Sequence, residues 1–385
     1  MNKTKLWSKN YIFIILINFL VFTNHIMLLS TFPFYVEKLG KSTTVAGTAA
    51  LLFSLVAVLC RPFVGWMLDN GKRKSILLLG LLGMGLMPLG YYFSSVLLIL
   101  LLFRMIHGAS LACSSTANAT IASDTIPPSR FAEGMGYFGM ATALATACAP
   151  SLGLFLMNRL GFTALFFTAA SLIICAFFLL LFLQETPMKK EKKPLLLSSL
   201  FSKDALPASG VTVIFMITFG ALENFLSKYA SENGLPSGGL YFLIMSILLL
   251  FTRLTVGKIA DQRGEDIFVY TCNASMLLSF LLLAFIPNQI TFFLSAVLSG
   301  YAFGGLEPAL QSMAVHTAPP EQRGSANSTF LCAYDIGIGI GGGLSGLLIT
   351  HLGYSHMWAI LALANIGSVL LYQLFGKHHP SSLKY

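Results

Sequence analysis

Residues 61–74 read RPFVGWMLDNGKRK, and residues 253–266 read RLTVGKIADQRGED. The two stretches lie 192 residues apart in a chain of 385 residues. Further residues recur at the same offset, and the matched pairs are Arg61 and Arg253, Gly65 and Gly257, Asp69 and Asp261, Gly108 and Gly300, Pro127-Pro128 and Pro319-Pro320, and Leu160-Gly161 and Leu352-Gly353. Chance matching of abundant glycine and proline is the alternative, but chance does not readily repeat two arginines and two aspartates as well. The sequence therefore predicts two copies of one structural unit in the same order.

The composition places most of the chain in a lipid bilayer. Hydrophobic residues make up 56% of the sequence and charged residues 10%, and the mean hydropathy is +0.77. Soluble domains average about 25% charged residues. Segments of about 20 mostly apolar residues can each cross the bilayer core as a helix. We predict an all-α integral membrane protein with twelve spans: 11–33, 44–68, 75–93, 95–118, 132–157, 160–183, 206–231, 235–257, 267–286, 289–315, 325–350 and 354–377.

Basic residues are unevenly divided between the two sets of connections, and the net charge is +9. One set carries Lys3, Lys5, Lys9, Lys72, Arg73, Lys74, Lys189, Lys190, Lys192, Lys193, Lys203, Arg323, Lys377 and Lys384. The other set carries Lys38, Lys41, Arg159 and Lys228. Because positively charged loops stay in the cytoplasm, both termini and the 184–205 loop are expected there, in a multi-pass cell-membrane protein. Nucleic-acid binding also uses basic clusters, but these are spread over six membrane-edge segments, so no nucleic-acid partner is expected.

The chain divides at one charged linker. We predict an N-terminal six-helix bundle at 1–183, a linker at 184–205 and a C-terminal six-helix bundle at 206–385. Residues 11–33 are interpreted as a span, because the segment is too long for the apolar region of a signal peptide. There is no Walker A, HExxH or GxSxG sequence, and the six cysteines lack metal-binding spacing. We therefore expect no enzyme activity, catalytic residue, cofactor or metal, and a monomer that uses an ion gradient.

The segment that follows the second span suggests a conformational latch. Asp69 stands at the end of a predicted helix, where the helix dipole disfavours an anion, so it needs a partner. Arg73 or the N-terminus of another helix would serve, and a pairing present in only one conformation would act as a latch. The alternative is a basic topology signal beside a surface aspartate. Gly65 permits close helix contact.

This stretch resembles the cytoplasmic signature of the major facilitator superfamily, Gly-x-x-x-Asp-x-x-Gly-Arg-Lys/Arg. Gly65, Asp69, Arg73 and Lys74 match it, whereas Lys72 occupies the second glycine position. In the second copy Gly257, Asp261 and Gly264 remain, and Glu265 and Asp266 replace the basic pair. The resemblance extends over the whole chain and implies twelve spans in two parallel repeats. It also implies gating roles for the signature residues, to which we add Arg61 and Arg253.

Two further segments resemble signatures of the same family. Arg104 and Gly108 in the fourth span match an Arg-x-x-x-Gly pattern linked to proton transfer, and His107 shares a helix face with Arg104. In the fifth span Gly136, Pro150 and Gly153 match an antiporter signature in which Ala145 and Ala149 replace two glycines. That resemblance implies export. The alternatives are a structural arginine and an ordinary small-residue packing face.

Three acids lie inside predicted spans: Glu223, Glu307 and Asp335. Depth along the helices makes Arg61–Asp335 and Arg253–Glu307 possible ion pairs, and static pairing is the alternative to proton coupling. Glu223 has no evident base at its depth, so it is the first candidate for a proton carrier. Asp124 and Glu133 lie near the membrane edge and are candidates for helix caps or latches.

The family resemblance also implies that spans 1, 4, 7 and 10 line the transport cavity. Their polar residues are Asn18, His25, Arg104, His107, Glu223, Asn224 and Glu307. His25 taken alone is more often a packed residue than a ligand. With 32 phenylalanines in the chain, this lining suits a small amphiphilic molecule. We expect a proton-coupled exporter of a drug or metabolite. The alternatives are a proton-coupled uptake symporter or facilitator for a nutrient, and a membrane receptor or lipid-handling scaffold without transport.

Overall fold

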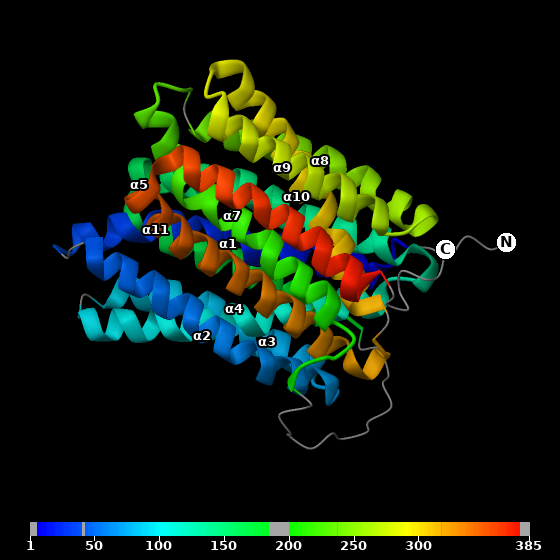
Figure 1. Ribbon diagram of the computed structural model, residues 1–385. Helices are drawn as coiled ribbons and strands as arrows, with labels where there is room; N and C mark the ends of the chain where they lie inside the picture. Colours follow the sequence, from blue (N-terminus) through cyan, green and yellow to red (C-terminus); the bar gives the residue numbers. More distant parts are fainter. Residues whose placement is uncertain are drawn as a thin grey trace. The chain divides into compact units, whose positions relative to one another are not determined.

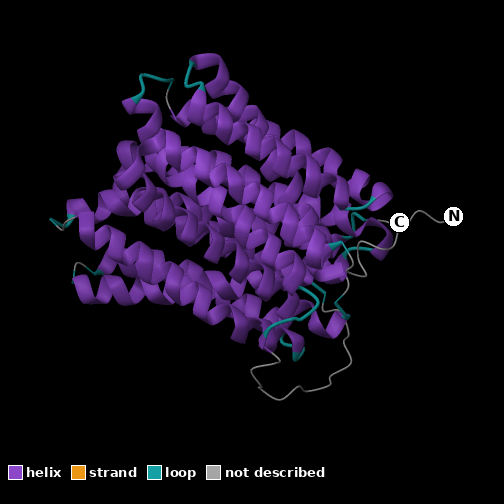
Figure 2. Ribbon diagram, in the orientation of Figure 1, coloured by secondary structure: helices purple, strands orange, loops and turns teal. Residues whose placement is uncertain are grey.

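The computed structural model describes residues 6–40, 43–94, 96–184, 200–236, 238–316 and 318–377. Every described segment is helix or loop (Figure 2), so the all-α prediction is confirmed for this part of the chain. The predicted linker lies mostly outside the described residues, as do Lys3, Lys5, Lys41, the lysines of 189–193 and Lys384.

The helices follow the predicted spans but extend beyond several of them (Figure 1). Their bounds are α1 Lys9–Lys38, α2 Thr43–Asp69, α3 Arg73–Phe93, α4 Leu97–Thr125, η1 Pro128–Arg130, α5 Phe131–Leu181, α7 Leu206–Glu232, α8 Gly238–Arg263, α9 Asp266–Phe285, α10 Gln289–His316, η2 Pro320–Gln322, α11 Arg323–Leu371 and η3 Tyr372–Gly376. Apolar length sets the predicted ends, whereas a helix continues past the hydrocarbon core wherever its backbone bonds remain favourable. The fourth helix accordingly ends at Thr125 and not at the predicted 118.

The two longest helices are each broken by one glycine. Gly161 divides α5 with φ 81° and ψ 175°, and Gly353 divides α11 with φ 79° and ψ 174°. A positive φ is readily adopted only by glycine, which explains why a glycine recurs at the repeat offset. Dividing α5 and α11 at these points gives twelve long helices in the described residues, as the hydropathy predicts. Ten of the stretches are long and apolar enough to cross a membrane.

The chain forms two compact units that exchange short segments. Unit 1 contains residues 1–126, 140–202 and 319–328, and unit 2 contains 127–139, 203–318 and 329–385. The exchanged segments, 127–139 and 319–328, each hold the short helical turn after α4 or α10 and the start of the next long helix. They begin at repeat-equivalent positions, so the exchange follows the internal repeat.

Close helix contacts inside each unit rest on matched glycines. In unit 1, α4 packs against α1, α2 and α3, and in unit 2, α10 packs against α7, α8 and α9. A Cβ at Gly108 would lie 2.2 Å from the carbonyl oxygen of Phe53, and one at Gly300 would lie 2.5 Å from that of Met245. Both distances are far below contact distance, so the absence of a side chain is what allows each pair of helices to approach.

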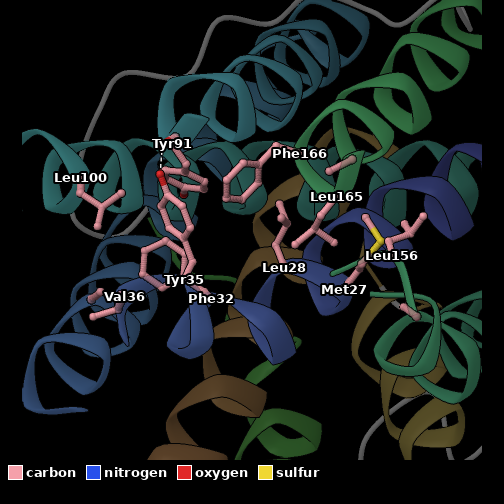
Figure 3. Close-up of a cluster of buried hydrophobic side chains, with 13 residues drawn as sticks. Met27, Leu28, Phe32, Tyr35, Val36, Tyr91, Leu100, Leu156, Leu165 and Phe166 are labelled. Atoms are coloured by element: carbon pink, nitrogen blue, oxygen red, sulfur yellow. Dashed lines mark hydrogen bonds between the residues drawn. The ribbon is translucent and has the colours of Figure 1, made fainter. Parts of the chain in front are cut away.

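A buried aromatic cluster lies at the C-terminal ends of α1 and α3 in unit 1. Figure 3 shows Phe32 and Tyr35 of α1 beside Tyr91 of α3 and Phe166 of α5. The hydroxyl of Tyr35 donates a hydrogen bond of 2.6 Å to the carbonyl oxygen of Tyr91. This cluster holds two aromatic rings, those of Phe32 and Tyr91, next to the polar residues of α4.

Candidate gating and transport sites

Asp69 binds the N-terminus of another helix. Its carboxylate accepts hydrogen bonds from the backbone N–H groups of Gly324, at 2.7 Å, and Ser325, at 3.1 Å. Both residues belong to the first turn of α11, within unit 1. The first N–H groups of a helix have no partner inside the helix and carry its positive dipole end, so they bind an anion well. Of the two partners considered for Asp69, the structure selects this one.

Gly65 and Gly324 allow this contact to form. A Cβ at Gly65 would lie 2.6 Å from the Cβ of Ser328, and a Cβ at Gly324 would lie 2.6 Å from the carbonyl oxygen of Gly65. The hydroxyl of Ser328 donates a hydrogen bond to the carbonyl oxygen of Arg61. The signature glycine Gly65 therefore allows the start of α11 to pack closely against α2.

Arg73 pairs with Asp124 beside the Asp69 contact. Its Nε lies 2.6 Å from Oδ2 of Asp124, and it also donates to the carbonyl oxygen of Pro320 at 2.7 Å. Arg323, the first residue of α11, lies 3.4 Å from Oδ1 of Asp124 and donates to the carbonyl oxygen of Ser123 at 2.7 Å. Asp124 thus joins two arginines. Glu133 is held by Arg130 through bonds of 2.6 and 2.8 Å.

Arg104 is sandwiched by aromatic rings in unit 1. Its guanidinium carbon lies 4.0 Å from the ring centre of Phe32 and 5.0 Å from that of Phe53. His25 stacks on Phe53 at 5.1 Å with an interplanar angle of 10°, and Nδ1 of His107 is 2.8 Å from the hydroxyl of Tyr91. The structure therefore brings together three of the predicted cavity residues.

Other predicted residues of unit 1 have separate partners. Asn18 donates to the hydroxyl of Thr142 at 2.9 Å. Arg61 donates to the hydroxyls of Ser115, at 3.0 Å, and Thr116, at 3.4 Å. Because Arg61 belongs to unit 1 and Asp335 to unit 2, their pairing stays a prediction.

Three acids of unit 2 interact electrostatically with one tyrosine. Arg253 and Glu307 form an ion pair. The phenol of Tyr334 interacts electrostatically with both of these residues, and also with Glu223 and Asp335. The Glu223 side chain is exposed, and the neighbouring Asn224 donates to the carbonyl oxygen of Gly220 at 2.7 Å. Thus the three predicted coupling acids interact with one side chain.

The antiporter-like segment forms a packing face in α5. Ala145 and Ala149 are fully buried. A Cβ at Gly153 would lie 2.8 Å from the side chain of Met27, so this glycine allows α5 to approach α1. Gly136 is buried at the start of α5. The side chains of Pro150, Gly257 and Asp261 are outside the described part, although all three positions lie in helices.

Sequence reasoning missed the aromatic and tyrosine partners. Phe32, Phe53 and Tyr91 surround the basic residues of unit 1, and Tyr334 joins the acids of unit 2. Nothing in a run of apolar residues separates these rings from the other aromatic residues of the spans. The sequence offered a signal for Tyr334 only. This residue precedes Asp335, and a phenol beside an intramembrane acid can form a hydrogen bond with it.

The described helices are those of a multi-span membrane protein with an internal repeat. Residues 14–289 and 239–384 match the family model of the Major Facilitator Superfamily. The chain belongs to this family.

Two relatives of the chain have roles in drug resistance or export. The chain is 25% identical over 378 residues to the multidrug resistance protein MdtG of Escherichia coli O1:K1, covering 92% of this chain and 91% of the relative. It is 22% identical over 343 residues to the staphylopine export protein of Staphylococcus aureus strain Mu50, covering 85% and 86%.

Solved structures show the same fold. The human organic anion transporter MFSD10 is similar with a TM-score of 0.82 and 18% identity, over 94% of this chain and 98% of that chain. FucP in the outward conformation is similar with a TM-score of 0.78 and 14% identity, over 94% and 98%. The protein is therefore a multi-pass transporter of small molecules.

Proposed function

We propose that this transporter is a proton-coupled antiporter that exports a small amphiphilic molecule. The observation that best supports export is the similarity to a staphylopine export protein and to a multidrug resistance protein, each matched over at least 85% of both chains. The close packing of Gly153 against α1 supports the same proposal, because small residues in the antiporter-like segment allow α5 to approach α1.

The proposed cycle is alternating access by rocking of a 1–183 bundle against a 206–385 bundle, with both termini cytoplasmic. The Asp69 contact with the first turn of α11 would hold one state of this cycle. The residues that would then act in gating are Gly65, Gly257, Asp69, Arg73, Asp261, Arg61 and Arg253. Breaking the contact would release the first turn of α11. This turn belongs to unit 1, whereas the helix from Thr329 onward belongs to unit 2.

We assign proton coupling to the three acids that interact electrostatically with Tyr334. Glu223, Glu307 and Asp335 outnumber Arg253, so at least one carboxyl group is left without an arginine partner in this set. Glu223 makes no ion pair with any described residue, so no fixed counter-ion holds its carboxyl group in the charged form. Glu307 and Asp335 are the second choices.

The test is substrate-induced proton flux in proteoliposomes with an imposed pH gradient, after a screen of amphiphilic compounds. Glu223→Gln should uncouple substrate movement from the gradient, because the variant cannot lose a proton, while downhill exchange continues. Glu232→Gln, at the exposed end of α7, is the matched control and should retain coupling. Proton flux in Glu223→Gln equal to that of the native protein would contradict the assignment.

A further inference from the structure

Arg104 is a buried cation with an unusual set of neighbours. Its side chain is 2% exposed, and the rings of Phe32 and Phe53 cover its guanidinium group. No described Asp or Glu forms an ion pair with it. Aromatic faces attract a cation, but they do not replace the hydrogen bonds that a guanidinium group loses when it leaves water.

The groups near Arg104 are basic as well. The positive charge of Arg104 acts on both His25 and His107, and that of Arg61 acts on His25. No acid acts on either histidine within the described residues. This part of unit 1 therefore has a positive potential that no described acidic residue balances nearby.

Three nitrogen atoms of this cluster lack hydrogen-bond partners among the described residues. They are Nε of Arg104, Nε2 of His107 and Nδ1 of His25. Nδ1 of His107 already faces the hydroxyl of Tyr91, so Nε2 is the nitrogen that remains for a ligand. Buried polar atoms without partners are rare in folded proteins, and they ask for an explanation.

We propose that Arg104, His107 and His25 bind the anionic group of the transported molecule, and that the substrate is a small organic anion with an aromatic or other apolar body. This inference rests on the proposed transport function, because it names the class of its substrate. A carboxylate would supply the missing negative charge and accept a hydrogen bond from the free Nε–H of the arginine, whose side chain also bonds the hydroxyl of Tyr91. The rings of Phe32 and Phe53 lie beside the cation and would contact the apolar body. Burial of the cluster does not oppose binding, since a transporter opens its site to each side in turn.

The test compares matched probes of different charge on the purified full-length protein in lipid nanodiscs. Benzoate and 2-naphthoate are the anions, benzamide and 2-naphthamide the neutral isosteres, and benzylamine the cation. Isothermal titration should show each carboxylate binding at least about tenfold more tightly than its amide. Arg104→Gln should abolish this preference, and Arg104→Lys should retain part of it, because lysine keeps the charge but not the planar fork. His25→Gln and His107→Gln should each weaken carboxylate binding severalfold.

Arg159→Gln is the control for loss of one positive charge, since Arg159 is exposed. A native protein that binds carboxylates no more tightly than amides would overturn the proposal. So would an unchanged preference in Arg104→Gln, or an equal loss in Arg159→Gln. If Arg104→Gln does not fold, His25→Gln and Phe53→Leu carry the test.

The outcomes separate this inference from the proposed function. Proton-coupled transport of cationic compounds that Arg104→Gln does not alter would refute the anion site and leave the antiporter standing. Carboxylate binding that depends on Arg104, without any proton flux, would refute the antiporter and leave the anion site standing.

Discussion

The polar centres of the two units stand on the same repeated backbone, but their chemistry is opposite. The basic cluster around Arg104 in unit 1 consists of His25, Arg104 and His107, and the repeat-equivalent residues in unit 2 are Ile217, Ala296 and Ser299. The acidic residues of unit 2 are Glu223, Glu307 and Asp335, and their equivalents in unit 1 are Thr31, Ser115 and Ala143. Gly108 and Gly300, which set equivalent helix contacts, are kept in both copies, whereas the residues of the two polar centres are not. Repetition therefore conserved the scaffold and left the two centres free to specialise.

The membrane-edge clusters differ in the same way. In unit 1, Asp124 joins Arg73 and Arg323. The equivalent positions in unit 2 are His316, Glu265 and Phe131, and there the rings of Phe131 and His316 stack at 5.2 Å. An ionic cluster responds to the charge of a single residue, whereas an aromatic stack is held by area and shape. We expect the unit 1 cluster to be the more sensitive to charge substitutions.

The largest expected difference concerns the partners of the equivalent arginines Arg61 and Arg253. Glu307→Gln leaves the buried Arg253 without its carboxylate, which costs about 3 kcal/mol. Ser115→Ala removes one hydroxyl acceptor from Arg61, which costs about 1 kcal/mol. Thermal unfolding in detergent should therefore show the larger drop in melting temperature for Glu307→Gln. Equal drops would mean that the two arginines depend on their partners to the same degree.

An intermediate effect should be common to both units. Gly108→Ala and Gly300→Ala each place a methyl group against a backbone carbonyl, at a cost of about 2 kcal/mol. Gly339→Ala in α11 is the control, because nothing lies within 4 Å of its Cβ position. That control should be neutral or slightly stabilising, since alanine favours a helix. Melting temperatures would show whether the two substitutions destabilise the protein equally. An unchanged melting temperature for Gly300→Ala would show that the helix contact is less tightly packed in unit 2 than in unit 1.

The smallest expected change in free energy concerns the latch. Asp69→Asn keeps one of the two oxygen acceptors for the N-terminus of α11 but loses the charge and one hydrogen bond, which weakens the contact by about 1 kcal/mol. A shift of 1.4 kcal/mol changes a two-state ratio about tenfold, so transport should suffer more than folding. Spin labels at Lys72 and Gln262 would report the distance distribution, and Asp204→Asn, which removes one exposed negative charge, is the control. Full transport with an unchanged distribution would leave Asp69 as a surface charge only.

Prediction from the sequence was strongest where a single segment carries the signal. Gly161 and Gly353 were matched by their offset, and the structure gives them nearly identical backbone angles. Asp69 was expected to need a partner, but the sequence offered both Arg73 and a helix N-terminus. The choice required knowing which distant segment reaches the end of α2, and that segment begins at Arg323.

The sequence by itself determined the twelve-helix membrane architecture and its internal repeat. Both follow from local physics, because a chain in lipid must satisfy its backbone hydrogen bonds within each helix and needs about 20 apolar residues to cross the core. Only the tertiary structure decided that two phenylalanine rings cover Arg104 and that Tyr334 interacts with three acids. Those neighbours come from different helices, and the rotation and close packing of each helix, set by small residues along its length, determine which side chains meet.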